Sequence, residues 1–195
     1  MKSKIFLFAI VVVFFLFNSC SDKEIEVTEE QKKQMRSTAS DFMYELKATL
    51  SNQIETNGLV SAMNVCSDSA QALTNKFGLQ RGVFVQRVSF RNRNENNFPD
   101  DYEQTVLNSF QEMLENDKLD ANTDLAEVVD EGGFTYLRYM KPILIQPECL
   151  NCHGNLSSMQ KEIRRQIRER YPKGKAYDYK PGDLRGAISI KKLIE

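Results

Sequence analysis

The sequence predicts an α+β fold, and two patterns support this class. After residue 28, apolar residues recur at intervals of three or four, which is typical of amphipathic helices. Shorter β-prone runs follow, but they do not alternate with helices as they would in a doubly wound parallel sheet. We therefore expect the order helix, helix, strand, helix, hairpin, helix and strand, with antiparallel strands.

Two helices are expected first. Thr28 and Gln31 have the spacing of a capping box, in which the side chain and backbone of each residue bond the other. The helical period then continues to a break at Asn57-Gly58 and resumes over residues 62–77. Gly78 follows where a C-terminal cap is expected.

The β-prone runs come later in the chain. A strand is expected over residues 83–90, followed by a polar loop and then a helix over residues 100–117. Residues 125–145 contain two β-prone runs separated by Glu131-Gly132-Gly133, the composition of a hairpin turn. The last strand is expected around residues 187–190.

One more helix is expected between the hairpin and the last strand. Ser157 and Gln160 form a second capping-box pattern, which predicts a helix over Ser157–Arg170 that ends at Tyr171-Pro172. Its basic run, Lys161–Arg170, is better explained as a solvated helix face than as an anion site.

The N-terminus has the pattern of an export signal. Lys2 and Lys4 precede thirteen uncharged, mostly apolar residues, Ile5–Phe17, a run shorter than the roughly 20 residues of a spanning helix. Ser19-Cys20 resembles a bacterial lipoprotein cleavage site, in which Cys20 becomes acylated. An uncleaved membrane anchor is the alternative.

This pattern predicts three segments: a signal peptide over residues 1–19, an acidic tether over residues 20–30 and one domain over residues 31–195. The protein would then be lipid-anchored in a bacterial cell envelope, facing the periplasm or the cell exterior. The 26 basic residues less Lys2 and Lys4 leave 24 against 27 acidic ones, so nothing suggests nucleic acid as a partner.

The segment Cys149-Leu150-Asn151-Cys152-His153 holds two of the four cysteines and the only histidine. A redox dithiol does not explain His153 and lacks a thioredoxin-like context. A zinc or structural site would have to use Cys66 as a fourth ligand, with two ligands adjacent in the chain. Covalent attachment of one haem c explains all three residues, because two thiols bind the porphyrin and the histidine then ligates the iron.

The second axial ligand has to be something other than a histidine. Met63 and Met140 lie in apolar contexts, and Cys66 lies on the inward face of the second predicted helix. Methionine raises the potential of haem iron, whereas a thiolate favours the ferric form. From these residues alone, Cys66 and the methionines are equally good candidates for the second axial ligand. An iron without a second ligand from the protein is the less favoured alternative.

Several motifs resemble the PAS-like single-haem c domains of the Tll type, catalogued among domains of unknown function. The resemblance spans about residues 35–190. It rests on Ala62-Met63-Asn64-Val65-Cys66 with Ala70, Arg87-Val88-Ser89, Arg91-Asn92, Asn97-Phe98-Pro99, Tyr102-Glu103, Cys149–Gly154, Tyr171-Pro172 and Gly182–Gly186. Gln71 departs from the family, which often has proline there.

The resemblance implies a PAS-like antiparallel sheet flanked by helices, with long N-terminal helices. It also implies haem attached through Cys149 and Cys152, and iron ligated by His153 and Cys66. Arg87 and Arg185 match family arginines that could pair with haem propionates. An equally weighted alternative is that Arg185 bonds Asp183 within its own turn.

Three functions are compatible with these residues. The first is a sensor of redox state or of small gaseous ligands, acting through a signalling partner. The second is a low-potential electron-transfer cytochrome of the periplasm with a redox partner protein. The third is a zinc or structural domain of the envelope. Catalysis is not expected, since the sequence offers no Ser/His/Asp set and its one histidine is already used.

Overall fold

The computed structural model describes residues 26–194, with residues 65–68 described by their backbone alone. The predicted signal peptide and Cys20 lie outside these residues. The elements in chain order are α1 (Glu29–Arg81), β1 (Phe84–Val88), η1 (Glu95–Asn97), α2 (Asp101–Glu115), β2 (Leu125–Glu131), β3 (Phe134–Leu144), η2 (Pro147–Cys149), α3 (Leu150–His153), α4 (Lys161–Arg170) and β4 (Leu184–Leu193). This order confirms the α+β class.

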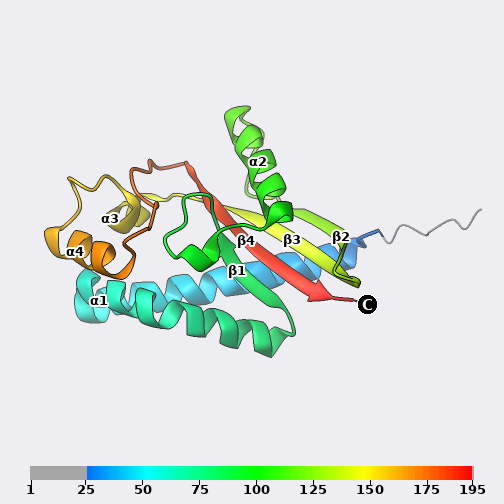
Figure 1. Cartoon of the computed structure of the whole chain (residues 1–195), viewed down its shortest axis with the longest axis horizontal. Helices are drawn as coiled ribbons and strands as arrows, with labels where there is room; N and C mark the ends of the chain where they lie inside the picture. The colour runs from blue at the N-terminus through cyan, green and yellow to red at the C-terminus, as the bar shows by residue number, and fades with distance from the viewer. Residues whose placement is uncertain (1–25, 195) are drawn as a thin grey trace, which may run out of the picture.

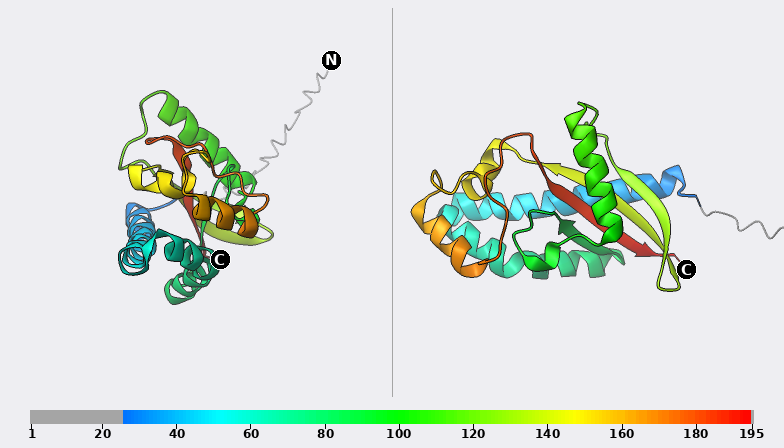
Figure 2. Two further views of the ribbon diagram at one scale, coloured as in Figure 1. Left: turned by 90° about the vertical axis from the view of Figure 1, so that its left-hand side faces the viewer. Right: turned by 45° about the horizontal axis from the view of Figure 1, so that its top comes forward.

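The strands form one antiparallel sheet in the order β1-β4-β3-β2 (Figure 1). Helix α1 covers one face through a core that includes Met35, Phe42 and Tyr139. Helix α2 covers part of the other face through Val106 and Phe110. The short helices α3 and α4 lie beyond one end of the sheet (Figure 2).

The predicted break between the first two helices is confirmed. Gly58 is the one non-helical residue inside α1, with φ 78° and ψ 168°, and the two arms of the helix fold back on each other (Figure 1). This backbone conformation favours glycine because a Cβ would collide with the backbone. The break turns the second arm back toward the sheet.

The predicted cap at Gly78 is wrong. Helix α1 continues to Arg81, and Gly82 is the cap, with φ 63° and its N–H donating to the Gly78 carbonyl. Gly78 is needed for packing instead, because a Cβ there would lie 2.7 Å from the Val83 carbonyl oxygen.

The predicted start of the fourth helix is also wrong. Ser157 donates from its backbone N–H to Asn155 Oδ1 at 2.8 Å, in a turn that precedes the helix. Helix α4 begins only at Lys161. The local hydrogen bond of Asn155 therefore replaces the capping box that the sequence suggested.

Asp124 joins α1 to the sheet. Its buried carboxylate accepts hydrogen bonds from Arg36 Nε at 2.6 Å and from the Tyr139 hydroxyl at 2.9 Å, and Lys32 Nζ lies 3.4 Å away. Burial raises the pKa of Asp124, but the hydrogen bonds from Arg36 and Tyr139 outweigh it and the net pKa is lowered. The charged form of Asp124 therefore stabilises the fold.

Within the described residues, no helix has the length and apolar character needed to span a bilayer.

We expect Asp124→Asn to lower the free energy of unfolding by about 2 kcal/mol at neutral pH, because the variant loses charge-assisted hydrogen bonds from Arg36 and Tyr139. Since the folded-state pKa is lowered, the contribution is present above the unfolded pKa and fades as pH falls through the folded value. Urea unfolding at several pH values measures both effects. Lys32→Met, which removes one partly exposed charge, should cost less than about 1 kcal/mol. Equal losses from the two variants would contradict this account.

Candidate functional site

The predicted site segment lies where β3 leaves the sheet. The chain passes through η2 and then makes the single turn of α3, which carries Cys152 and His153. At Gly154 a Cβ would lie 2.6 Å from the Leu150 carbonyl oxygen, so only glycine allows this tight exit from the turn.

The two cysteines are half-buried and have apolar neighbours. Cys152 packs against a cluster that contains Met63 from the second arm of α1, together with Ile163 and Ile167 from α4. Cys149 packs against a second cluster that contains Tyr179. Residues three apart in a helical turn lie on one side of it, so both thiols can reach one bound group.

His153 makes its contacts through one ring nitrogen. Its Nδ1 lies 3.2 Å from the Ala176 carbonyl oxygen and 3.1 Å from Arg93 Nη2, and its ring meets Tyr179 edge-on. Burial, with the positive charges of Arg185 and Arg93, holds the pKa of His153 well below its usual value. The lowered pKa favours the neutral imidazole. In the tautomer that carries its proton on Nδ1, Nδ1–H donates to the Ala176 carbonyl and Nε2 is the candidate metal ligand.

Arg93 fixes the position of this histidine. Its Nη2 donates to the carbonyl oxygens of Cys152 and, at 2.7 Å, of Ala176, and its guanidinium lies 4.7 Å above the Tyr177 ring. Its Nη1 is buried and has no hydrogen-bond partner among the described residues. One side chain thus joins three segments of the site and still has a donor to offer.

Three further arginines, Arg87, Arg91 and Arg185, contribute positive charge around His153 and Tyr179. Arg185 Nη1 donates to the Arg91 carbonyl at 3.2 Å, and the guanidinium groups of Arg91 and Arg185 lie 4.0 Å and 5.5 Å from the Tyr179 ring centre. Burial lowers the pKa of Arg185 to about 10. The positive charges of Arg93 and Arg87 lower it as well, whereas Tyr179 acts to raise it. The site is therefore strongly positive.

No carboxylate among the described residues forms an ion pair with Arg91, Arg93 or Arg185. The alternative partner predicted for Arg185 is engaged elsewhere, since Asp183 Oδ2 accepts from the Lys180 N–H at 2.8 Å. The cluster is thus suited to a group that brings its own carboxylates.

The structure separates the two candidate methionines. Met140 is fully buried under α2 with Phe110 and is not part of the site. Met63 packs in the cluster that contains Cys152. Cys66 follows Met63 by three residues on the same arm of α1, but its side chain lies outside the described residues. Among the side chains that are described, no group of three His, Cys, Asp or Glu residues could hold a metal ion.

Sequence reasoning missed Arg93, Ala176 and the two tyrosines at positions 177 and 179. Arg93 belongs to the polar loop expected after β1, and a charged loop residue gives no local signal of burial. The pairing of this loop with residues 176–179 is a long-range contact that periodicity cannot reveal.

Together the fold and the site define a PAS-like α+β domain with a CxxCH motif beyond one end of its sheet. A model of the Tll0287-like family, described as Tll0287, matches residues 23–192, and the chain belongs to this family. This match confirms the resemblance seen in the sequence.

The chain is also similar to a solved structure, the crystal structure of the cyanobacterial heme-protein Tll0287. The two are 21% identical with a TM-score of 0.64, over 87% of this chain and 98% of that one. This likeness supports the fold. No curated protein matches the chain.

We expect Arg93→Gln to lower the free energy of unfolding by about 2 kcal/mol, because its buried hydrogen bonds to the carbonyls of Cys152 and Ala176 are lost. Chemical denaturation measures this loss. Arg91→Gln is the matched control: Arg91 is exposed and donates to one carbonyl, that of Tyr177, so its loss should cost less than about 1 kcal/mol. A larger cost for Arg91→Gln than for Arg93→Gln would show that Arg93 does not fix the site.

Proposed function

We propose that this chain is a haem c protein in which Cys149 and Cys152 attach one haem covalently and His153 ligates the iron. The observation that carries the proposal is the junction of η2 with the single turn of α3, where Cys149 and Cys152 lie three residues apart. The next residue, His153, has its Nδ1 3.2 Å from the Ala176 carbonyl oxygen, which leaves Nε2 as the candidate iron ligand. Haem would supply a redox-active iron with room for an axial ligand. The similar solved structure is that of a heme-protein, which supports this choice.

The residues around the turn fit haem in two ways. The apolar cluster beside Cys152 can cover a porphyrin. The arginines offer donors for the two propionates, in particular Arg185 and Arg87, while the unpartnered Nη1 of Arg93 offers one more. In this proposal Arg93 and Ala176 orient the His153 ring, and the glycine at position 154 keeps the exit of the turn narrow.

We propose Cys66 as the second axial ligand. Its support is the family resemblance and its position on α1, one helical turn beyond Met63, whose side chain packs with Cys152. Met63 is the alternative, because it is the methionine that reaches this cluster. A thiolate opposite His153 would favour ferric iron.

The proposed role is sensing of redox state or of small gaseous ligands, by a protein held in the bacterial envelope through lipid on Cys20. A thiolate ligand that can be oxidised or displaced supports this role, and so does the PAS-like fold. Signalling would then pass to a separate protein partner. A low-potential electron carrier of the periplasm is the second candidate, supported by the same single haem site. We propose no enzymatic activity.

Covalent attachment is tested by pyridine haemochrome spectra of protein made with a cytochrome c maturation system. The wild type should give the spectrum of a haem with two thioether bonds, because Cys149 and Cys152 lie three residues apart where η2 meets α3. Cys149→Ala or Cys152→Ala should shift it to that of a single bond, and the double variant should lose covalent haem. Asn151→Ala, an exposed position between the two cysteines, is the control and should keep the wild-type spectrum. A colourless wild type would favour the zinc or structural alternative.

The axial ligand is tested by low-temperature EPR of the ferric protein. Cys66→Ala should abolish the low-spin thiolate signal and open a site that binds carbon monoxide after reduction. Met63→Leu should preserve that signal, since leucine retains the packing of the cluster. If Met63→Leu removes the low-spin signal and Cys66→Ala does not, methionine is the ligand and the carrier role is favoured.

A further inference from the structure

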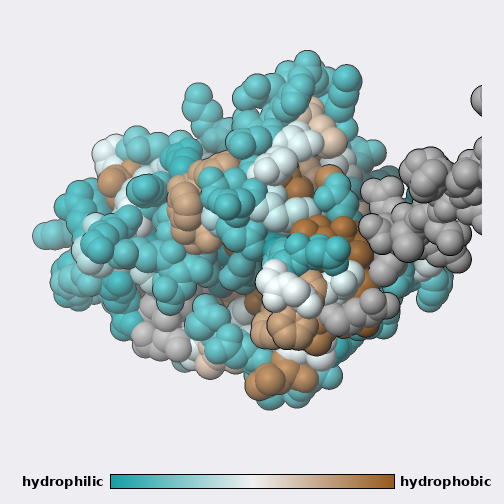
Figure 3. All heavy atoms as spheres, turned by 45° about the vertical axis from the view of Figure 1, so that its right-hand side comes forward, coloured by the Kyte–Doolittle hydropathy of each residue, from teal (hydrophilic) through white to brown (hydrophobic). Residues whose placement is uncertain are grey.

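The α2 face of the sheet carries an uncovered apolar area at the end opposite the CLNCH segment. We define this terminal patch as Phe84, Phe134, Tyr136, Leu193 and the lysine between them, Lys191. Phe84 is 71% exposed, Phe134 53% and Leu193 50%. Figure 3 shows apolar side chains gathered on one part of the surface, with hydrophilic ones around them.

The strand register places these residues on one face. Phe84 pairs with Lys191, and Tyr136 pairs with Leu193, while residues two apart on a strand share a face. The Phe134 and Tyr136 rings lie 6.4 Å apart, and Lys191 Nζ lies 3.9 Å from the Tyr136 ring centre. The patch is therefore one continuous surface from β1 to β3.

Helix α2 stops short of this patch. Arg138, which is 1% exposed, forms ion pairs with Asp100 at 2.8 Å and with Glu103 at 3.3 Å, both at the start of α2. Arg138 lies in the same row of the sheet as Lys191 and Phe84. The row of Arg138 is the limit of the area that α2 covers. From this row toward Tyr136 and Leu193, no described element covers this face of the sheet.

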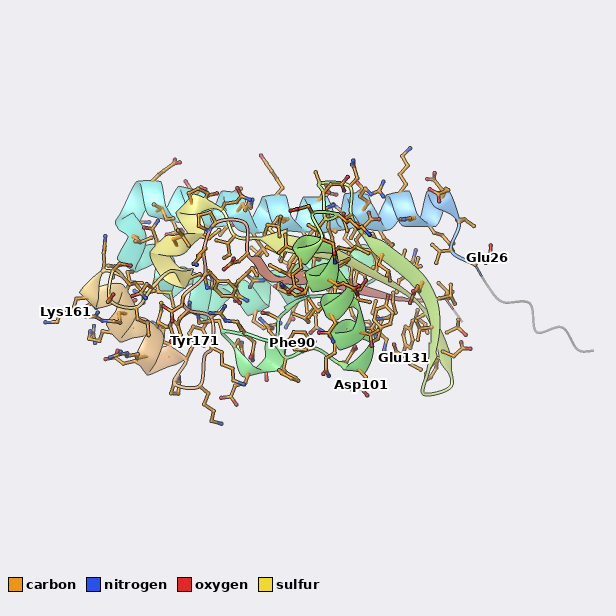
Figure 4. All side chains as sticks on the ribbon, turned by 90° about the horizontal axis from the view of Figure 1, so that it is seen from above. Glu26, Phe90, Asp101, Glu131, Lys161 and Tyr171 are labelled. Atoms are coloured by element: carbon orange, nitrogen blue, oxygen red, sulfur yellow. The ribbon has the colours of Figure 1, made fainter. Side chains whose placement is uncertain are left out.

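The described chain begins at the same end of the molecule. Val27 and Ile194 pack against one core cluster, and the Ile194 N–H donates to the Thr135 carbonyl at 2.9 Å. Figure 4 shows Glu26 and Glu131 at this end and Lys161 and Tyr171 at the other. The chain therefore enters the fold at the same end of the molecule as the patch, on the α1 face of the sheet.

A lipid on Cys20 would hold this end close to a membrane. Six peptide steps separate Cys20 from Glu26, and a fully extended chain spans at most about 3.6 Å per residue, so the reach is roughly 20 Å. Aromatic rings beside a lysine suit the boundary between lipid headgroups and acyl chains. Lys191 also forms an ion pair with Glu131. The negative charge of Glu131, which lies beside the patch, is therefore balanced.

We propose that the terminal patch rests on the membrane surface and that the CLNCH end of the molecule therefore points away from it, toward soluble partners. This inference deepens the proposed function and depends on its lipid anchor. It does not depend on haem.

Hydroxyl-radical footprinting read by mass spectrometry tests the proposal. The probe is the lipidated full-length holoprotein in vesicles of phosphatidylethanolamine and phosphatidylglycerol, compared with the Cys20→Ser variant in solution. Oxidation of Phe84, Phe134 and Leu193 should fall by about fivefold or more in vesicles, because exposed side chains become buried. Phe98, which is 50% exposed and lies outside the patch, is the internal control and should be oxidised equally in both samples.

A paired substitution sharpens the test. Phe84→Gln combined with Phe134→Gln should abolish the protection of Leu193 in vesicles, while the control Phe98→Gln should leave it intact. Equal oxidation of the patch in both wild-type samples would overturn the proposal. Protection that already occurs in the Cys20→Ser sample and grows with protein concentration would also overturn it, in favour of a second copy of the chain. The mass of the N-terminal peptide and the haem spectrum, taken on the same samples, report the anchor and the haem site separately.

Discussion

The guanidinium of Arg93 is the constraint on which the site depends. It comes from the loop after β1 and bonds the carbonyls of Cys152 and Ala176, which belong to segments far apart in the sequence. A buried guanidinium is tolerated only where hydrogen bonds replace its hydration. The three segments therefore have to meet in one arrangement, and that arrangement engages Nδ1 of His153. The sheet and both arms of α1 serve to deliver these segments to the same end of the molecule.

The charge of the site is not balanced by the described residues. Arg93 and Arg185 form no ion pair with a described carboxylate, and burial lowers the pKa of Arg185 to about 10. A buried charge without a partner costs several kcal/mol. Hydrogen bonds to backbone carbonyls offset part of this cost, and a bound group that brings negative charge would offset more, so binding of such a group would stabilise this end of the fold. The apolar clusters beside both cysteines restrict that group to one with a large apolar body.

Sequence reasoning succeeded where the signal was local. The break at Gly58 and the turn at Gly132-Gly133 need positive φ, which glycine adopts readily, and both were predicted. It failed at Gly78 and Ser157, where the same residue types serve packing and a preceding turn. The CLNCH motif was visible because its residues are adjacent. Arg93 was not, because a charged residue in a loop has the same local pattern whether it is solvated or buried by a distant segment.

If haem occupies this site as proposed, two charge effects would act on its potential in opposite directions: the arginines would raise it and a thiolate ligand would lower it. A guanidinium about 10 Å from a redox centre, at an effective dielectric constant of about 20, favours the reduced state by about 1.7 kcal/mol, or ~70 mV for one electron. Carboxylates bound to the arginines cancel much of this effect. Axial ligands, by contrast, shift haem potentials over a range of about 0.8 V. If haem binds as proposed, the residue that provides the second axial ligand would set the potential, and the arginines would adjust it. A thiolate ligand would give a low potential that the arginine cluster would be too weak to reverse, whereas Met63 as the ligand would give a high one. Under the proposed function, the choice between sensor and carrier would therefore depend on the second arm of α1, which carries both candidate ligands.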